Sequence, residues 1–407
     1  MSNYIFTDAF VIDCTNENSM FEGWVVVEND RIKEVGNGKI GNLPENSIVI
    51  NCHGQTLLPG LIDCHVHMSA IDANLVELNR RNFPSEIVIK SLSIIKETLE
   101  QGFTTARDCG WLDLGFKKAL NEGLISGPRV FISGQPLTQT GGHGDFRLST
   151  ESYETKVNLG ICDGVDEVRK GAREQIRRGV DFIKIMAGGG AASPSDEIDT
   201  SQYSLEEMQA IVFEAQSAGK YVAAHCYSDR SIELCCNAGV RTIEHGNLLT
   251  ELAAKLIKEK GSYLVPTIVT YVMISKMGKE LGLSNDMIRK INQALEKAQN
   301  SLNIAYSNGL KIGSGSDLLG PMQVFKGLEL ELQAEIMGPM NALLAATKVN
   351  AEIIRQEKEL GTIEVGKIAD LILLNGNPID KISLFQKYRE NITFIMQNGK
   401  VYKNTMS

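Results

Sequence analysis

Histidine is scarce in this chain, so the positions of its imidazole side chains are informative. The sequence holds six histidines, and His65 and His67 stand one residue apart in the segment LIDCHVH. Side chains alternate along a strand, so both imidazoles should point to the same side of a strand at 61–66. Neutral imidazole is a common ligand of Zn²⁺ and similar ions, and this pair could therefore bind one metal ion.

Three further ligand candidates also follow apolar strand-like segments. His225 ends the segment 221–224, His245 follows Thr242 to Glu244, and Asp317 closes the run GSGSD after 311–313. A single histidine at a strand end is more simply a hydrogen-bonded polar residue. Four of six histidines at equivalent points favour a shared metal ion instead. Structural zinc is more typically held by closely spaced cysteines, so this donor set indicates a catalytic ion.

The segments that must position these residues alternate with amphipathic helices. Apolar residues recur at helical spacing in 87–99 and in 165–176. Eight strand-and-helix units over roughly 300 residues are typical of a (β/α)₈ barrel, whose active sites lie at the C-terminal strand ends. The expected barrel strands are 61–66, 104–106, 130–133, 182–186, 221–224, 242–243, 263–265 and 311–313.

Both ends of the chain have a different pattern, in which short β-segments follow one another without helices. In the first fifty residues these are 4–6, 9–12, 24–27, 31–35 and 48–50, and near the C-terminus they are 369–374, 393–396 and 400–402. We therefore expect an α/β protein in which residues 57–360 form the barrel, while residues 1–56 and 361–407 together form a small β-sandwich.

Composition excludes several functional classes. The chain has 41 Lys and Arg against 50 Asp and Glu, a net charge of −9 with no block of like charge, which argues against a nucleic-acid or anionic-membrane binder. No apolar run approaches the ~20 residues that span a bilayer. The N-terminus shows no secretory signal and the eight cysteines form no CxxC pair, so we expect a cytoplasmic protein with reduced cysteines. We also expect a homo-oligomer that acts on a small molecule.

Taken together, these motifs resemble the amidohydrolase superfamily of metal-dependent hydrolases. The resemblance rests on His-x-His after the first strand, a lysine in the fourth, single histidines after the fifth and sixth, and an aspartate after the eighth. The segments LLPGLIDCHVH at 57–67 and GTIEVGKIADL at 361–371 are also similar, so the likeness covers essentially the whole chain. It implies a barrel joined to a β-sandwich.

The resemblance further implies that CO₂ carboxylates Lys184 and that the resulting carbamate bridges two divalent ions, most simply Zn²⁺. One ion would be held by His65, His67, Lys184 and Asp317, and the other by Lys184, His225 and His245. A carbamate makes chemical sense inside an apolar strand, where an ammonium would be costly. The alternatives are an ammonium that reaches out of the strand end, or one that pairs with Asp317.

Within the superfamily the chain looks most like the branch of dipeptidases and carboxypeptidases, which includes prolidases and arginine or lysine carboxypeptidases and is related to imidazolonepropionase. This likeness implies that a hydroxide bridging the two ions attacks an amide carbonyl. Asp317 would then take up the proton and return it to the leaving amine. A barrel that keeps a metal ion only for structure would usually have lost a ligand, whereas none is missing here. A ring deaminase or cyclic amide hydrolase remains an alternative, although imidazolone hydrolases lack the bridging lysine.

Three residues are candidates for binding substrate. His143 lies in the glycine-rich segment QTGGHGD, where its ring could reach substrate or simply face water. Tyr227 and Arg230 follow a predicted ligand and could grip a free α-carboxylate, Arg230 through a bidentate fork. Their alternative role is ordinary packing at a helix N-terminus.

The expected reaction is the release of a C-terminal amino acid from dipeptides or N-acyl amino acids. We expect Arg or Lys as the released residue, because the chain resembles the basic-residue carboxypeptidases and carries Asp196, Glu197 and Asp199 in the loop after the fourth strand. Carboxylates on a loop are most often solvated, so an Xaa-Pro dipeptidase is the alternative.

Overall fold

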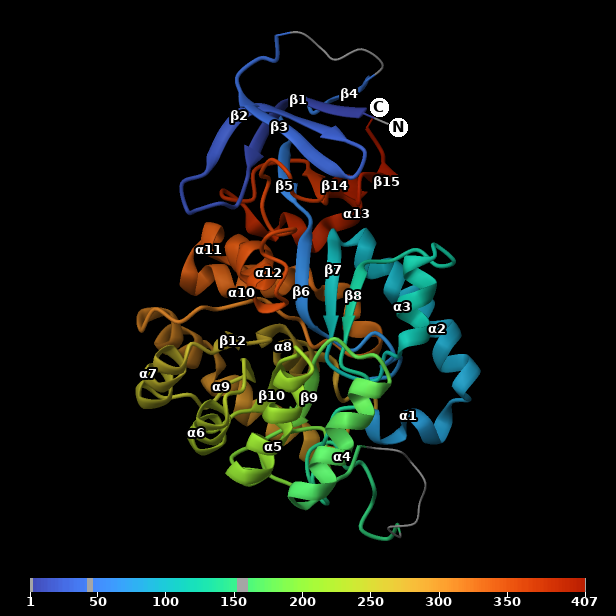
Figure 1. The fold of residues 1–407 in the computed structure, drawn as a ribbon, viewed down its shortest axis with the longest axis vertical. Coiled ribbons are helices and arrows are strands. Elements are labelled where there is room, and N and C mark those ends of the chain that lie inside the picture. Colours follow the sequence, from blue (N-terminus) through green and yellow to red (C-terminus); the bar gives the residue numbers. More distant parts are fainter. Residues whose placement is uncertain (1–2, 42–46, 152–159, 407) are drawn as a thin grey trace.

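The computed structural model describes residues 3–41, 47–151 and 160–406 of the chain. A β-rich part carries both described ends of the chain, and a larger α/β part lies below it (Figure 1). In the described residues no helix is long and apolar enough to cross a membrane. All eight cysteines are buried and free, as expected for a chain without a CxxC pair.

The β-rich part is one sheet built from both ends of the chain. Its strands follow the order β15-β14-β13-β5-β1-β2-β3, and β4 pairs with β1. Their bounds are β1 (Asn3–Ile12), β2 (Met20–Glu28), β3 (Arg31–Asn37), β4 (Ser47–Asn51), β5 (Thr56–Pro59), β13 (Leu371–Leu374), β14 (Ile392–Gln397) and β15 (Lys400–Asn404).

The strands expected to form the sandwich are hydrogen-bonded along one continuous path, in a β-rich part that both ends of the chain build together. The segments expected at 4–6 and 9–12 form the single strand β1, whose register shifts between Phe6 and Ala9. Asp8 takes a positive φ of 53° at this irregularity. β1 and β14 are not neighbours in the strand order, yet the rings of Phe6 and Phe394, one from each strand, pack edge to face with centroids 5.3 Å apart.

The larger part contains two parallel sheets, which are ordered β6-β7-β8 and β12-β11-β10-β9. The strands are β6 (Leu61–Val66), β7 (Phe103–Asp108), β8 (Arg129–Ile132), β9 (Ile183–Met186), β10 (Val222–Cys226), β11 (Thr242–His245) and β12 (Tyr263–Val265). Most of their residues are buried, as expected for parallel strands covered by helices.

Backbone hydrogen bonds connect the two sheets at both edges. On one side Leu137, which follows β8, donates to Lys184 in β9 over 2.9 Å. On the other side Gly313 donates to Leu264 in β12 over 2.8 Å, and Cys64 in β6 donates to Ser314 over 2.9 Å. The strand expected at 311–313 is reduced to one isolated bridge, because only Ile312 pairs with a residue of β12, Leu264.

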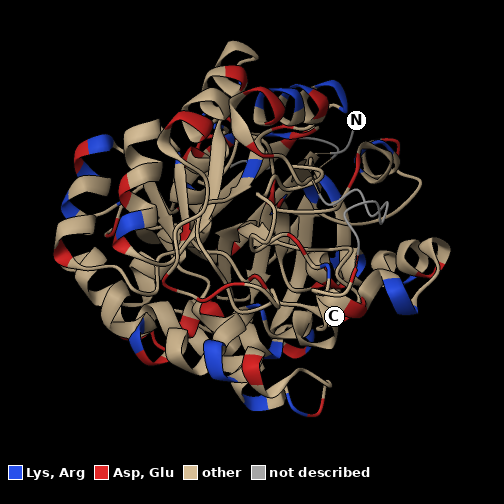
Figure 2. Cartoon of the chain, turned by 90° about the horizontal axis from the view of Figure 1, so that it is seen from below, with Lys and Arg blue, Asp and Glu red and all other residues tan. Residues whose placement is uncertain are grey.

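Helices surround these strands when the molecule is viewed from below, and charged residues of both signs are interspersed along them (Figure 2). The helix predicted around 87–99 is α2, and the one around 165–176 is α4. The helices are α1 (Leu75–Arg81), α2 (Pro84–Glu100), α3 (Leu114–Asn121), α4 (Gly164–Arg177), α5 (Leu205–Ser217), α6 (Asp229–Ala238), α7 (Glu251–Lys260), α8 (Ile268–Met277), α9 (Asn285–Ser307), α10 (Gly327–Met337), α11 (Pro339–Leu344), α12 (Asn350–Ile353) and α13 (Tyr388–Asn391).

Local sequence explains where several helices near the strand ends begin. In α5, Ser204 accepts a hydrogen bond from Glu207 N while the Glu207 side chain accepts one from Ser204 N, which forms a capping box. The Ser228 side chain caps α6 by accepting a hydrogen bond from Ser231 N, and Gly239 ends that helix with a φ of 89°, a conformation that glycine adopts without a Cβ clash. These caps fix the loops that carry side chains at the C-terminal ends of the strands.

Candidate active site

Four histidines and one aspartate converge at the C-terminal ends of the parallel strands. Asp317 Oδ1 lies 3.5 Å from His65 Nε2 and 3.2 Å from His67 Nε2. Its other oxygen, Oδ2, lies 3.9 Å from His245 Nδ1. The ring of His225 completes the cluster, with its centroid 4.6 Å from that of His245. The structure thus brings together five of the six residues expected to bind metal.

Lys184, the sixth, projects from β9 into the same cavity. Its side chain is only 1% exposed, so the ammonium does not reach out of the strand end. Among the described residues, Lys184 Nζ has no hydrogen-bond partner, and this leaves the alternative pairing with Asp317 without support. A buried ammonium without a partner is costly, which sets Lys184 apart from the other buried lysines.

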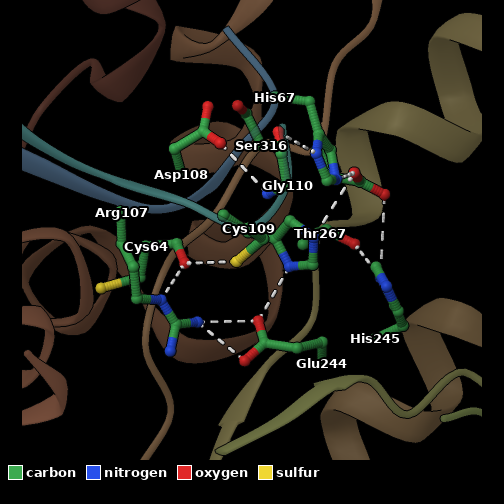
Figure 3. A network of polar contacts seen from close by, with 12 residues as sticks. Cys64, His67, Arg107, Asp108, Cys109, Gly110, Glu244, His245, Thr267 and Ser316 are labelled. Atoms are coloured by element: carbon green, nitrogen blue, oxygen red, sulfur yellow. Dashed lines mark hydrogen bonds and ion pairs between the residues drawn. The ribbon is translucent and has the colours of Figure 1, made fainter. Parts of the chain in front are cut away.

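A buried ion pair lies directly behind His65. Glu244 Oε2 is 2.8 Å from His65 Nδ1, and both oxygens of Glu244 accept hydrogen bonds from Arg107 Nη2 at 2.7 and 2.8 Å. The side chains of Arg107 and Glu244 are fully buried, and Figure 3 shows them facing each other below His67. Sequence reasoning missed both residues, although Glu244 directly precedes the predicted ligand His245.

Burial controls the protonation of the cluster. It lowers the pKa of His65, His225 and His245 well below the ordinary histidine value, so these rings are neutral and able to bind a metal ion. Burial alone would raise the pKa of Asp317, but the neighbouring His65 and His67 outweigh it and hold that pKa below the ordinary aspartate value. The aspartate is therefore a carboxylate at neutral pH.

His143 lies against this cluster from the loop after β8. Its ring stacks on that of His225 with centroids 4.1 Å apart, and its Nδ1 is 3.0 Å from Ser193 Oγ. Ser193 in turn donates a hydrogen bond to Asp196. Gly190 has to be glycine because a Cβ there would overlap the His143 ring. The ring therefore has a fixed place in the wall of the cavity.

Tyr227 also lines the cavity, but Arg230 does not. Tyr271 donates a hydrogen bond to the hydroxyl of Tyr227 over 2.9 Å, which leaves the Tyr227 hydrogen free to donate elsewhere. Thr270 lines the same wall, and within the described chain its Oγ1 has no partner. Arg230 is exposed in the first turn of α6 and pairs with Glu233 at 3.2 Å, so the structure does not support the expected carboxylate fork.

The rest of the cavity wall is largely apolar. It includes Leu75, Trp111, Phe146, Met186, Ile274 and Ile291. The acidic residues of the loop after β9 do not line it. Asp196 accepts hydrogen bonds from Ser193 and Gln202, Glu197 pairs with Arg289 at 2.7 Å, and Asp199 is exposed. The expectation that this loop faces a cationic substrate side chain therefore has no support in the structure.

Several residues of the site have left-handed backbone conformations. The φ angles are 77° at Trp111, 76° at His245, 49° at Thr267 and 52° at Asp317. Such values are costly for residues with a Cβ and are enriched at functional sites, where surrounding contacts hold them. Here Thr267 Oγ1 lies 2.7 Å from His245 Nδ1 and Asp317 N donates to His65 O over 2.7 Å. The strained backbone is thus tied to the cluster itself.

Known proteins are similar to this chain in sequence and in fold over most of its length. The chain is 33% identical to an ochratoxinase of Aspergillus niger over 370 residues, which cover 85% of this chain and 75% of the relative. A solved prolidase complexed with N-methylphosphonate-L-proline is 42% identical, with a TM-score of 0.95 and coverage of 99% of this chain and 100% of that one. A Xaa-Pro dipeptidase with bound methionine is 28% identical, with a TM-score of 0.90 and the same coverage.

A direct match to a protein family gives the same result. Residues 56–405 match the amidohydrolase family, and this match includes every strand and loop that contributes to the histidine cluster. The prediction of the superfamily from HxH, the strand lysine and the later histidines is confirmed. The chain belongs to the amidohydrolase family, and prolidase-like enzymes are among its structural neighbours.

Proposed function

We propose that this protein is a metal-dependent amide hydrolase that releases an apolar C-terminal amino acid, proline included, from dipeptides or N-acyl amino acids. The observation that carries the proposal is Lys184, a buried amine without a partner among the described residues, which lines the same cavity as four histidines and Asp317. Two divalent metal ions and a carboxylated Lys184 would give each of these side chains a role as a metal ligand.

The proposal includes a closed (β/α)₈ barrel as the scaffold. Its support is the set of backbone hydrogen bonds that connect the two parallel sheets through Leu137 on one edge and Ser314 on the other. Helices on the outside and polar ligands at the C-terminal strand ends are the arrangement that barrel enzymes use. The boundaries proposed for this unit are residues 57–360, with residues 1–56 and 361–407 contributing the outer sheet.

The residues present fit two divalent ions, most simply Zn²⁺. His65, His245 and Asp317 each offer a ligand atom within 4.8 Å of the others, and the neutral imidazoles need not lose a proton. The set for one ion would be His65, His67, Lys184 and Asp317, and the other would use Lys184, His225 and His245. When bound, such ions make nucleophilic water available at neutral pH and polarise the amide carbonyl.

Asp317 is the proposed general base and acid. It is a carboxylate at neutral pH, and its oxygens lie within 4 Å of three of the histidine rings. It can therefore take a proton from the attacking water and deliver it to the leaving amine nitrogen, a role worth about 10²- to 10⁴-fold in rate.

His143, stacked on His225, is placed to donate a hydrogen bond to the substrate from its ring.

The released residue is proposed to bind between Tyr227 and Thr270 by its α-carboxylate. Burial raises the pKa of Tyr227 above its ordinary value, so the hydroxyl stays protonated and can donate. Thr270 Oγ1, which has no hydrogen-bond partner among the described residues, lies in the same wall. Met186, Ile274 and Ile291 offer an apolar surface to the side chain, which favours Pro, Leu or Met over Arg or Lys. The neighbours with proline analogue and methionine bound support this direction.

A single substrate panel tests the proposal. We would measure kcat/KM for Ala-Pro, Ala-Leu, Ala-Arg and Ala-Lys, the matching N-acetyl amino acids, and Ala-Leu amide. Apolar residues should exceed basic ones, and the capped amide should fall by at least about tenfold, because it leaves the donors of the site unpaired. Faster release of Arg or Lys would contradict the apolar preference. If a cyclic amide added to this panel is hydrolysed and none of the linear compounds is, the cyclic amide alternative is favoured instead.

A further inference from the structure

The loop that joins β9 to α5 contacts both rings of the stack formed by His143 and His225. Its two ends pair with each other, because Gln202 N donates a hydrogen bond to Ala187 O over 2.9 Å. Near the start of the loop, Gly189 O lies 3.0 Å from His225 Nε2. The loop therefore holds one predicted metal ligand through its backbone, and we call it the β9–α5 loop.

Asp196 engages two donors of this loop with its carboxylate. Its Oδ1 accepts a hydrogen bond from Ser193 Oγ, and its Oδ2 accepts one from Gln202 Nε2 over 2.6 Å. Ser193 and Gln202 are only 1% and 3% exposed, so water cannot readily replace Asp196 as their partner. A carboxylate can accept from both donors at once, because each of its oxygens is an acceptor. Asp196 therefore links two buried side chains.

The same two side chains hold His143 at both its backbone and its ring. Gln202 Oε1 accepts a hydrogen bond from His143 N over 2.9 Å, and Ser193 Oγ lies 3.0 Å from Nδ1 of the ring. Two paths of contacts thus run from the Asp196 carboxylate to one histidine. Among the described residues, His143 Nε2 has no hydrogen-bond partner, which leaves this nitrogen for the substrate.

Lys290 in α9 fixes the backbone around Asp196 from outside the loop. Its Nζ donates hydrogen bonds to Ser193 O over 3.1 Å and to Asp196 O over 2.5 Å, and it pairs with Asp286 at 3.2 Å. Lys290 is 1% exposed, so this buried ammonium has three acceptors, whereas Lys184 Nζ has none among the described residues. The Asp196 carboxylate is therefore presented to its two donors from a backbone that a neighbouring helix holds in place.

We propose that Asp196 is a positioning residue, which fixes the His143 ring in the wall of the catalytic cavity for contact with substrate. This inference rests on the proposed function, in which the His143 ring binds the substrate. Ser193, Asp196 and Gln202 do not line the catalytic cavity, whereas His143 does. An effect of Asp196 on turnover therefore has to pass through His143, to which both of its side-chain paths lead.

A double-mutant cycle separates this role from a general stabilisation of the loop. Asp196→Ala should lower kcat/KM for Ala-Leu about 10- to 100-fold, because a displaced ring no longer meets the substrate. In a His143→Ala background the same substitution should change kcat/KM less than about twofold, since the side chain through which it acts is absent. Equal losses in the two backgrounds would overturn the inference.

A second variant breaks only the path to the ring. Ser193→Ala removes the hydroxyl beside His143 Nδ1 and keeps the bond between Gln202 and Asp196, so it makes the same distinction if Asp196→Ala fails to fold. It should lower kcat/KM about tenfold or more in the wild-type background and less than about twofold in His143→Ala. An unchanged kcat/KM in Ser193→Ala would contradict the proposed path.

Glu197→Ala is the matched control. Glu197 is a carboxylate of the same loop, but it pairs with Arg289 at 2.7 Å and contacts neither Ser193 nor Gln202. It should retain the wild-type kcat/KM in both backgrounds. A loss as large as that of Asp196→Ala would show that any missing carboxylate in this loop has the same effect, and this would contradict the specific role of Asp196.

The position of the ring can also be followed without catalysis. In protein labelled with ¹³C at histidine Cε1, the His143 signal is the one that His143→Ala lacks, out of six histidines. Asp196→Ala should shift or broaden this signal, and Glu197→Ala should leave it unchanged. An unchanged signal in Asp196→Ala would overturn the inference. A shifted signal in a protein that cleaves none of the substrate panel would refute the proposed function but support the control of the His143 ring by Asp196.

Discussion

Glu244 Oε2 lies 2.8 Å from Nδ1 of His65, and Arg107 holds the other side of the same carboxylate. The carboxylate fixes the proton of His65 on Nδ1 and leaves Nε2 directed at Asp317, 3.5 Å away. A fully buried Arg and Glu pair contributes little net stability, because desolvation offsets much of the attraction. Its main effect here is to set the tautomer and the orientation of one ligand.

Glu244→Gln should therefore weaken the binding of one metal ion and leave the binding of the other unchanged. The amide of the variant must point its NH₂ group toward either His65 or Arg107. In either case this NH₂ group faces another hydrogen-bond donor, so one hydrogen bond of the wild type is lost. We expect about 10- to 100-fold weaker binding of the ion held by His65, with the ion at His225 and His245 retained. Titration of metal-free protein against a chromophoric chelator measures the two affinities separately.

Asp370→Asn is the matched control for this variant. Asp370 pairs with Arg129 at 2.7 Å in a largely buried position, but it contacts none of the proposed ligands. It should lower the melting temperature without changing either metal affinity. If Glu244→Gln lowers the melting temperature and binds both ions as the wild type does, the orienting role is wrong.

Lys184→Ala tests the bridging lysine. Elemental analysis should give close to two divalent ions per wild-type chain, and the variant should lose at least one of them with most of the activity, because both proposed ligand sets include Lys184. Added bicarbonate should increase metal loading of the wild type, since it supplies CO₂ for the carbamate. The same bicarbonate should not change loading of Lys184→Ala. One ion in the wild type together with an active variant would exclude the binuclear site.

Asp317→Asn separates proton transfer from metal assembly. Asparagine keeps an oxygen that can serve as a ligand, but it cannot accept the proton from water. We expect kcat to fall by about 10²- to 10⁴-fold while at least part of the metal stays bound. Steady-state kinetics and metal analysis on the same preparation check both effects. Turnover at the wild-type rate would remove Asp317 from the mechanism.

The sequence predicted the structure best where residues that can bind metal follow segments with a clear strand or helix period. HxH, the strand lysine and the single later histidines identified the family, because few folds place these residue types at successive strand ends. Strand period and helix period likewise located most elements, including α2 and α4. The segment 311–313 was predicted as a strand, yet only Ile312 pairs with its neighbour. The apolar residues of a short segment do not show how many of its residues will pair with a neighbouring strand.

Side-chain partners that depend on distant or helical geometry could not be predicted. Arg230 follows the ligand closely in sequence, but the cap at Ser228 starts α6 so that Arg230 pairs with Glu233 at the surface. His65 and Glu244 are 179 positions apart, and only the finished fold shows that they meet. The acidic loop was likewise assigned to a substrate because the partners of Asp196 and Glu197 are not visible in the sequence.

Glu329 in α10 should make the stability of the protein depend on pH. It is buried, its Oε2 accepts a hydrogen bond from Val269 N over 2.7 Å, and burial raises its pKa from 4.5 to about 8. Between these two values the folded protein keeps a proton that the unfolded chain has released. The free energy of unfolding should therefore fall as pH rises from about 4.5 to about 8, by at most about 1.4 kcal/mol per pH unit from this group.

Glu329→Gln removes this dependence, because an amide keeps an oxygen for Val269 N and has no charge to bury at any pH in the range. Relative to wild type, the variant should gain stability progressively from pH 5 to pH 8 and then level off. Denaturant unfolding of both proteins at each pH measures the difference. Glu335→Gln, at an exposed position of the same helix, is the control and should retain the wild-type profile. A constant difference between wild type and Glu329→Gln across this range would show that Glu329 does not carry the proton.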